Sequence, residues 1–121
     1  MKRIYIAGPY SADNVMEVLH NIRKGIEMSY KVFALGCAPF SPWLDYHFVL
    51  SDKQHKLKIQ DFYDYSLAWL KVSDAMLVLP NYKSSKGTLK EIEYAESLGI
   101  PVFYSLKELL KWKTNQASDA S

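Results

Sequence analysis

The sequence predicts a three-layer α/β/α domain built on a parallel sheet of four or five strands. Short apolar runs alternate along the chain with longer segments of helical periodicity, and glycine or proline separates many of them. Neighbouring parallel strands need a crossover connection, which a helix supplies, and such crossovers are right-handed. We therefore expect helices to cover both faces of the sheet.

The individual elements follow from this alternation. The expected strands are β-rich or strongly apolar runs at 2–7, 37–42, 75–80 and 101–105. The expected helices have apolar residues at helical spacing and cover 14–35, 56–72, 88–98 and 105–113. Residues 43–55 are aromatic and irregular, which predicts a loop or a short helix. The polar tail 114–121 is expected to be disordered.

Length and composition favour a single small domain, 1–113, that acts inside the cell. The chain has 121 residues, of which 49% are apolar, enough for one core and too few for two. Its formal charge of +2 is far from the basic field of a protein that binds polymeric nucleic acid. Cys37 is the single cysteine, and no apolar run is long enough to span a membrane. These features predict a cytoplasmic protein without disulfide bonds or a thiolate metal cluster.

The carboxyl ends of the strands are the expected ligand edge, because open parallel sheets bind their ligands there. The segments that follow these ends are Gly8-Pro9-Tyr10-Ser11, Ser41-Pro42-Trp43 and 81–87. Asp74 precedes its strand, so it falls at the opposite edge and is expected to be structural.

The helix after the third strand carries Glu91, Glu93 and Glu96, which are not equivalent. On a helical wheel Glu91 lies close to the centre of the apolar arc, whereas Glu93 is almost opposite and Glu96 is at a margin. One interpretation of Glu91 is a capping box with Thr88 as the N-cap residue. The other is a partly desolvated carboxylate that acts as base or nucleophile on a ligand.

The loop before this helix, SSKG at 84–87, offers hydroxyls, a lysine and a glycine next to a helix N-terminus. That combination is suited to holding an anion. It does not match the full phosphate-binding P-loop pattern, so an ordinary polar turn is the alternative.

Three segments together resemble the nucleoside 2-deoxyribosyltransferase superfamily over residues 3–105. They are IYIAGPYS, SLAWLKVSDAMLVLP and the pattern S-x-G-x-x-x-E-I-x-x-A-x-x-L-G-I-P-V. The chain is most similar to the small branch that includes 2′-deoxynucleoside 5′-monophosphate N-glycosidases. The resemblance implies a flavodoxin-like fold, Glu91 as a glycosidic nucleophile, and no metal or redox cofactor.

The resemblance also implies substrate contacts. Ser85 stands where the monophosphate hydrolases have a phosphate-binding serine, and Gly87 and Ser11 are expected near the same phosphate. Gly8 belongs to the same loop as Tyr10, which is expected beside the sugar or base. For Tyr10, packing in the core is the alternative.

Ser66 departs from the family pattern, in which an aspartate at this position orients the substrate or protonates the leaving base. Loss of such a group typically lowers the rate by ~10²–10⁴-fold. Ser66 therefore implies help from another group, a different substrate, or binding without turnover. Asp45 and His47 are candidate substitutes, with surface-loop residues as the alternative interpretation. Asp61 and Asp64 are expected to point away.

We therefore expect a nucleotide N-glycosidase that forms a covalent glycosyl-glutamate and favours hydrolysis over deoxyribosyl transfer. A non-catalytic module that binds a nucleotide or an ADP-ribose-like ligand is the rival from another class. A third hypothesis is an enzyme that cleaves the nicotinamide bond of a dinucleotide. The resemblance also implies a homodimer or a larger homo-oligomer.

Overall fold

The computed structural model of the chain describes the backbone of residues 1–120 and the side chains of residues 1–116. The elements in chain order are β1 (Arg3–Ala7), α1 (Val15–Ala34), β2 (Ala38–Phe40), the 3₁₀ helix η1 (Pro42–Asp45), α2 (Tyr46–Ser51), α3 (Ile59–Lys71), β3 (Ala75–Val78), the 3₁₀ helix η2 (Tyr82–Ser84), α4 (Lys86–Ser97), β4 (Val102–Phe103) and α5 (Leu106–Ala120).

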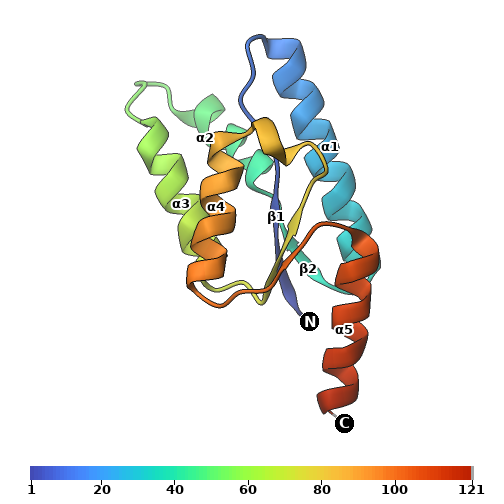
Figure 1. Cartoon of the computed structure of the whole chain (residues 1–121). Helices are drawn as coiled ribbons and strands as arrows, with labels where there is room; N and C mark the ends of the chain where they lie inside the picture. The colour runs from blue at the N-terminus through green and yellow to red at the C-terminus, as the bar shows by residue number, and fades with distance from the viewer. Residues whose placement is uncertain (121) are drawn as a thin grey trace.

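The strands form a parallel sheet, which in the described residues has four strands in the order β2-β1-β3-β4. Helices α1 and α5 cover one face of this sheet, and α3 and α4 cover the other (Figure 1). The predicted three-layer α/β/α fold with a parallel sheet is thus confirmed. Because β1 connects to β2 on one side while the chain continues to β3 on the other, the strand order reverses between β1 and β3.

The sheet has a hydrophobic core on each face, and side chains of the central strands point alternately into the two cores. Ile4 and Ile6 of β1 face the α1 and α5 layer, in the cluster that also contains Val32 of α1. Tyr5 and Ala7 face the α3 and α4 layer. Strand side chains point alternately to opposite faces, so this strand, buried from Ile4 to Ala7, supplies both cores.

Two helices end at glycines. Gly36 after α1 and Gly99 after α4 have φ values of +85° and +73°, in the left-handed region that glycine adopts without strain. At the start of α1, the Asn14 side chain caps the helix by accepting from the Glu17 amide at 2.9 Å.

Asp74 lies at the edge of the sheet opposite to the expected ligand edge, as predicted. Its carboxylate accepts a hydrogen bond from the backbone amide of Arg3 at 2.7 Å and also lies 3.6 Å from the Arg3 guanidinium. This pairing ties the start of β1 to the start of β3.

Several boundaries differ from the predicted ones. Helix α3 begins at Ile59 instead of residue 56, because the carboxylate of Asp52 accepts from the amides of Lys56 and Leu57 and holds them in a turn. The segment 43–55 contains η1 and α2. Helix α5 continues to Ala120, past residue 113, so the predicted disordered tail overlaps this helix and Ser121 lies outside the described residues. Where the domain ends stays a prediction.

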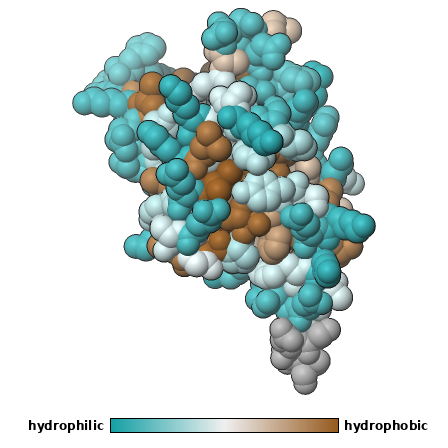
Figure 2. Space-filling view, viewed as in Figure 1, coloured by the Kyte–Doolittle hydropathy of each residue, from teal (hydrophilic) through white to brown (hydrophobic). Residues whose placement is uncertain are grey.

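One face of the molecule has a hydrophobic strip with hydrophilic side chains around it (Figure 2). The strip lies between α4 and α5, where the chain passes through the edge strand β4. Val102 and Phe103 of this strand are half-buried. Within residues 1–120, no helix combines the length and the apolar character needed to cross a membrane.

Candidate functional site at the carboxyl edge of the sheet

The candidate site lies where the strand order reverses, at the carboxyl ends of β1 and β3. The loop 8–14 leaves β1 toward α1, while residues 79–85 lead from β3 into α4. Open α/β sheets bind their ligands outside the strand ends at such a reversal of strand order. The first two turns of α4 and the segment after β2 complete its surroundings.

Glu91 faces β1 and meets Tyr5. The Tyr5 hydroxyl donates a hydrogen bond to the Glu91 carboxylate. Tyr5 is fully buried and Glu91 is half-buried. Burial raises the pKa of Glu91 to about 7, while the hydrogen bond from Tyr5 opposes this rise because it stabilises the charged form. Glu91 is therefore divided between its acid and its carboxylate near neutral pH.

The capping-box interpretation of Glu91 is wrong. Helix α4 begins at Lys86, with Ser85 as its N-cap residue. The Ser85 hydroxyl oxygen accepts from the Thr88 amide at 3.2 Å and from the Thr88 hydroxyl at 2.8 Å. Glu91 therefore lies in the second turn and has no helix terminus to cap.

Ser66 belongs to the same cluster as Tyr5 and Glu91. Its hydroxyl is close enough to the Tyr5 oxygen to lower the pKa of Tyr5, which partly offsets the increase caused by burial and by the charge of Glu91. The inward orientation expected of Ser66 agrees with this contact. Asp61 and Asp64 of the same helix are exposed; they accept from the Lys58 amide and the Gln60 side chain, respectively.

Asp45 and Tyr10 form a second pair beside this cluster. Burial and the nearby Asp45 carboxylate raise the pKa of Tyr10, and the charge of Asp45 also acts on Tyr5. Asp45 is only 7% exposed, so burial raises its pKa, against the opposing effect of the nearby Tyr10 hydroxyl. The interpretation of Asp45 as a surface residue is therefore wrong. His47 is exposed and stacks on Tyr46, with ring centroids 4.2 Å apart.

The remaining candidates differ in their surroundings. A side chain at Gly8 would meet the Leu79 side chain at 2.6 Å, so this glycine is needed for packing between the first loop and the end of β3. At Gly87 a Cβ would have nothing within 4 Å. Ser11 is exposed. Gly87 and Ser11 thus leave room for a ligand, and whether they contact one stays a prediction.

Sequence reasoning missed Tyr5 as a site residue. It lies in the middle of a buried apolar strand, where a tyrosine is readily taken as part of the core. A signal was present, because its neighbours Ile4 and Ile6 alternate with it and point to the opposite face. A buried tyrosine needs a partner for its hydroxyl, and a partner could have been sought on the helix that covers that face.

The described side chains contain no group of three or more His, Cys, Asp or Glu residues that could hold a metal ion. Each acid of the site instead has a tyrosine nearby: Tyr5 donates a hydrogen bond to Glu91, and Tyr10 is close enough to Asp45 for its pKa to be raised. Such an arrangement is suited to proton transfer and to attack by a carboxylate.

Comparison with known proteins gives a family and a fold. The family described as "Domain of unknown function (DUF7768)" matches residues 2–105. A solved 2-deoxyribosyltransferase from the psychrotolerant bacterium Bacillus psychrosaccharolyticus matches with a TM-score of 0.53 and 22% sequence identity, covering 83% of this chain and 69% of that one. No curated protein is significantly similar in sequence.

Proposed function

We propose that this chain, which belongs to the DUF7768 family, cleaves the bond between base and sugar of a nucleotide. The observation that carries the proposal is the half-buried Glu91 carboxylate, which accepts a hydrogen bond from Tyr5 beside the reversal of strand order. The solved enzyme with the same fold is named as a 2-deoxyribosyltransferase, which supports chemistry at the glycosidic carbon.

The proposed reaction begins with attack of Glu91 on C1′ of the sugar. The bond to the base breaks through an oxocarbenium-like transition state, and a glycosyl-glutamate forms. Water then attacks C1′, the bond between C1′ and the Glu91 oxygen breaks, and the proton that the water loses compensates for the one that the departed base has taken. Partial burial favours this role, because a carboxylate with few surrounding waters loses little solvation when it bonds to carbon. Hydrolysis is the preferred outcome, and transfer to a second base is the variant of the same step.

A 5′-monophosphate is the proposed substrate, with its phosphate near Ser85, Gly87 and Ser11. The N-terminus of α4 offers free amides and the positive end of the helix dipole. The Ser85 oxygen accepts two hydrogen bonds from Thr88, which leaves its proton available for a phosphate oxygen. Open space at Gly87 lets an anion approach the backbone.

The rival function is binding of a nucleotide or ADP-ribose-like ligand without turnover. The observation that favours it is Ser66, because its hydroxyl contacts Tyr5 at the place where the resemblance implies an aspartate. Homo-oligomer formation and a cytoplasmic location also stay predictions.

The decisive experiment incubates the protein with ribo- and deoxyribonucleosides and their 5′-monophosphates and measures free base by chromatography. Glu91→Gln should abolish release, whereas Glu93→Gln, an exposed carboxylate on the same helix, should leave it unchanged. Ligand binding without any release of base would support the rival function. Release that persists in Glu91→Gln would instead rule out the nucleophile.

A further inference from the structure

The loop 8–14, which leaves β1 toward α1, is held by side chains of two other elements. The Trp43 indole of η1 donates to the Pro9 carbonyl at 2.9 Å. The Asn21 side chain of α1 donates to the Tyr10 carbonyl at 3.1 Å. Pro9 and Tyr10 are adjacent, so two successive peptide groups are fixed. Water can satisfy the carbonyls of a surface loop, so these bonds fix the backbone conformation in addition to satisfying it.

Asn21 is a polar residue on the core-facing side of α1. It is only 9% exposed, and the neighbouring Ile22 is buried as well. An aliphatic side chain is the ordinary choice at such a position, because a buried amide group is costly unless it has a hydrogen-bond partner. Among the described residues, the partner of the Asn21 side chain is the Tyr10 carbonyl. The polar character of Asn21 therefore serves the loop.

Trp43 is fixed by packing as well as by its hydrogen bond. The residue is fully buried, and its ring packs directly against Gly25 of α1. A Cβ at Gly25 would collide with this ring, so the close approach depends on glycine. Because the ring is already immobile, its bond to the Pro9 carbonyl costs little further side-chain entropy.

The direction of these two carbonyls also sets the direction of the amides that follow them. In a trans peptide group the C=O and the next N–H point in opposite directions. The carbonyls of Pro9 and Tyr10 point toward η1 and α1, and both peptide bonds are trans. The N–H groups of Tyr10 and Ser11 therefore point away from these two elements. Neither N–H donates to another described residue.

Two successive N–H groups without a partner in the described chain are suited to binding an anion. They follow the carboxyl end of β1, the strand from which Tyr5 donates to Glu91. Ser11 is exposed, so a ligand can approach its backbone. If the proposed function is correct, the anion at this place is the 5′-phosphate of the nucleotide.

We propose that Asn21 and Trp43 are positioning residues of the nucleotide site, which hold the amides of Tyr10 and Ser11 toward the 5′-phosphate. Neither side chain contacts the phosphate; each acts through a carbonyl of the loop. A loop that is already fixed loses less conformational entropy when the ligand binds. The inference rests on the proposed function and extends it, because it adds the loop after β1 to the phosphate ligands at the start of α4.

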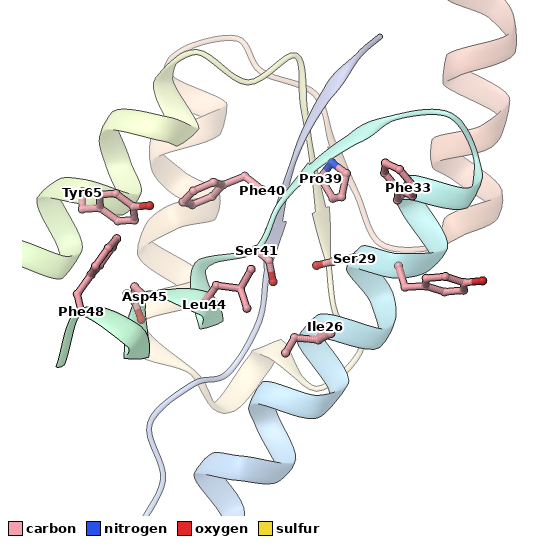
Figure 3. A pocket seen from close by; sticks show the side chains of 11 residues that line it. Ile26, Ser29, Phe33, Pro39, Phe40, Ser41, Leu44, Asp45, Phe48 and Tyr65 are labelled. Atoms are coloured by element: carbon pink, nitrogen blue, oxygen red, sulfur yellow. The ribbon is translucent and has the colours of Figure 1, made fainter. Parts of the chain in front are cut away.

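Ser29 offers a matched control on the same helix. It is 8% exposed, close to the value for Asn21, and its hydroxyl donates to the Gly25 carbonyl at 2.8 Å, within α1. Ser29 and Ser41 line a cavity of about 460 Å³ beside β2 (Figure 3). Neither Glu91 nor the loop 8–14 contributes to the described lining of this cavity. Ser29→Ala thus removes a buried polar group of α1 without removing a contact to the loop.

The test compares Asn21→Leu with the wild type on the 5′-monophosphate that releases its base fastest and on the matching free nucleoside. Leucine is similar in size and suits a buried position, but it cannot donate. KM for the monophosphate should rise by roughly 2–10-fold, the effect of one hydrogen bond. KM for the nucleoside, or its inhibition constant if it is not cleaved, should stay near wild type, as should kcat. Ser29→Ala should change none of these values.

Trp43→Phe repeats the test at the other contact. Phenylalanine keeps an aromatic ring but has no N–H for the Pro9 carbonyl, so KM for the monophosphate should again rise selectively. An equal rise for the nucleoside in both variants would show that the two residues only support the fold. An unchanged KM for the monophosphate would also overturn the proposal. In either case, base release that requires Glu91 would still support the proposed function.

A binding measurement separates the loop from the chemistry and does not depend on turnover. In NMR spectra of the wild type, the backbone amides of Tyr10 and Ser11 should shift on titration with inorganic phosphate. Trp43→Phe and Asn21→Leu should weaken this binding by roughly 2–10-fold, whereas Ser29→Ala should not. Amides that do not respond in the wild type would overturn the proposal, even if base is released and even if a variant does not fold. A response without any base release would overturn the proposed function and leave an anion site held by Asn21 and Trp43.

Discussion

The hydroxyl of Tyr5 donates a hydrogen bond to the carboxylate of Glu91, a residue 86 positions later in the chain. This bond crosses from the sheet to α4 and stabilises the ionised form of Glu91, against burial, which favours the acid. The protonation of the proposed nucleophile is thus set by two opposing effects, and each can be changed by substitution.

Tyr5→Phe should move the acid limb of the pH–rate profile to higher pH. Removal of the donor leaves burial unopposed, so the pKa of Glu91 should rise above about 7. A hydrogen bond to a charged group contributes ~1.5–3 kcal/mol, which corresponds to ~1–2 pH units. Base release measured from pH 5 to 9 checks the shift. Tyr63→Phe, at an exposed tyrosine of α3, should leave the limb in place.

The difference in free energy of unfolding between Glu91→Gln and wild type should favour the variant more at pH 8 than at pH 5. The pKa of Glu91 is raised from an ordinary 4.5 to about 7, so ionisation between these values disfavours the folded state. The free energy of unfolding of the wild type should fall by on the order of 1–3 kcal/mol across this window. Glutamine does not ionise, so the variant avoids that loss. Urea unfolding at both pH values measures it. An equal effect from Glu93→Gln would attribute the gain to net charge instead.

Ser85→Ala should lower stability and, independently, weaken the binding of monophosphates. Loss of the N-cap costs ~1 kcal/mol, and Asn14→Ala at the cap of α1 should cost a similar amount. Only Ser85→Ala should raise KM for a 5′-monophosphate while leaving KM for the free nucleoside unchanged. If both variants leave KM for the monophosphate unaltered, Ser85 is a cap and not a phosphate ligand.

Alanine at Gly8 and at Gly87 should have opposite effects on stability. Gly8→Ala brings a Cβ to 2.6 Å from the Leu79 side chain and should cost ~1–3 kcal/mol. Gly87→Ala has free space and a helical position, so it should be neutral or stabilise by up to ~1 kcal/mol. Thermal unfolding compares the two. A higher KM for monophosphates in the stable Gly87→Ala protein would then report a contact with the ligand.

Much of the fold could be predicted because its signals are local. The alternation of Ile4, Tyr5 and Ile6 within a short run and the glycine stops at Gly36 and Gly99 depend only on neighbouring residues. The start of α4 was less predictable, because Ser85 and Thr88 can both cap a helix. Lys86 and Gly87 between them have no helical pattern, so the sequence predicts a start at residue 88, two residues after the observed one.

The candidate site was predictable only where a residue's position in its own helix indicated burial. Glu91 could be selected on the helical wheel, since the apolar arc of α4 includes it. Asp45 could not be distinguished from a surface residue, because the segments that surround it, such as the loop with Tyr10, are distant in sequence and meet it only in the folded chain. The contact of Tyr5 with Glu91 was also inaccessible, since it joins segments that are brought together only when the sheet forms.

Because the side chains of β1 alternate between two faces, the candidate site forms only if β1 pairs with β3 in the correct register. A shift of β1 by one residue against β3 would turn Tyr5 toward α1 and bring Ile4 or Ile6 opposite Glu91. The carboxylate would then be covered by aliphatic groups that cannot donate a hydrogen bond. A molecule misfolded in this way would be inactive from the outset, so the pairing that builds both cores also decides whether the chemistry is present.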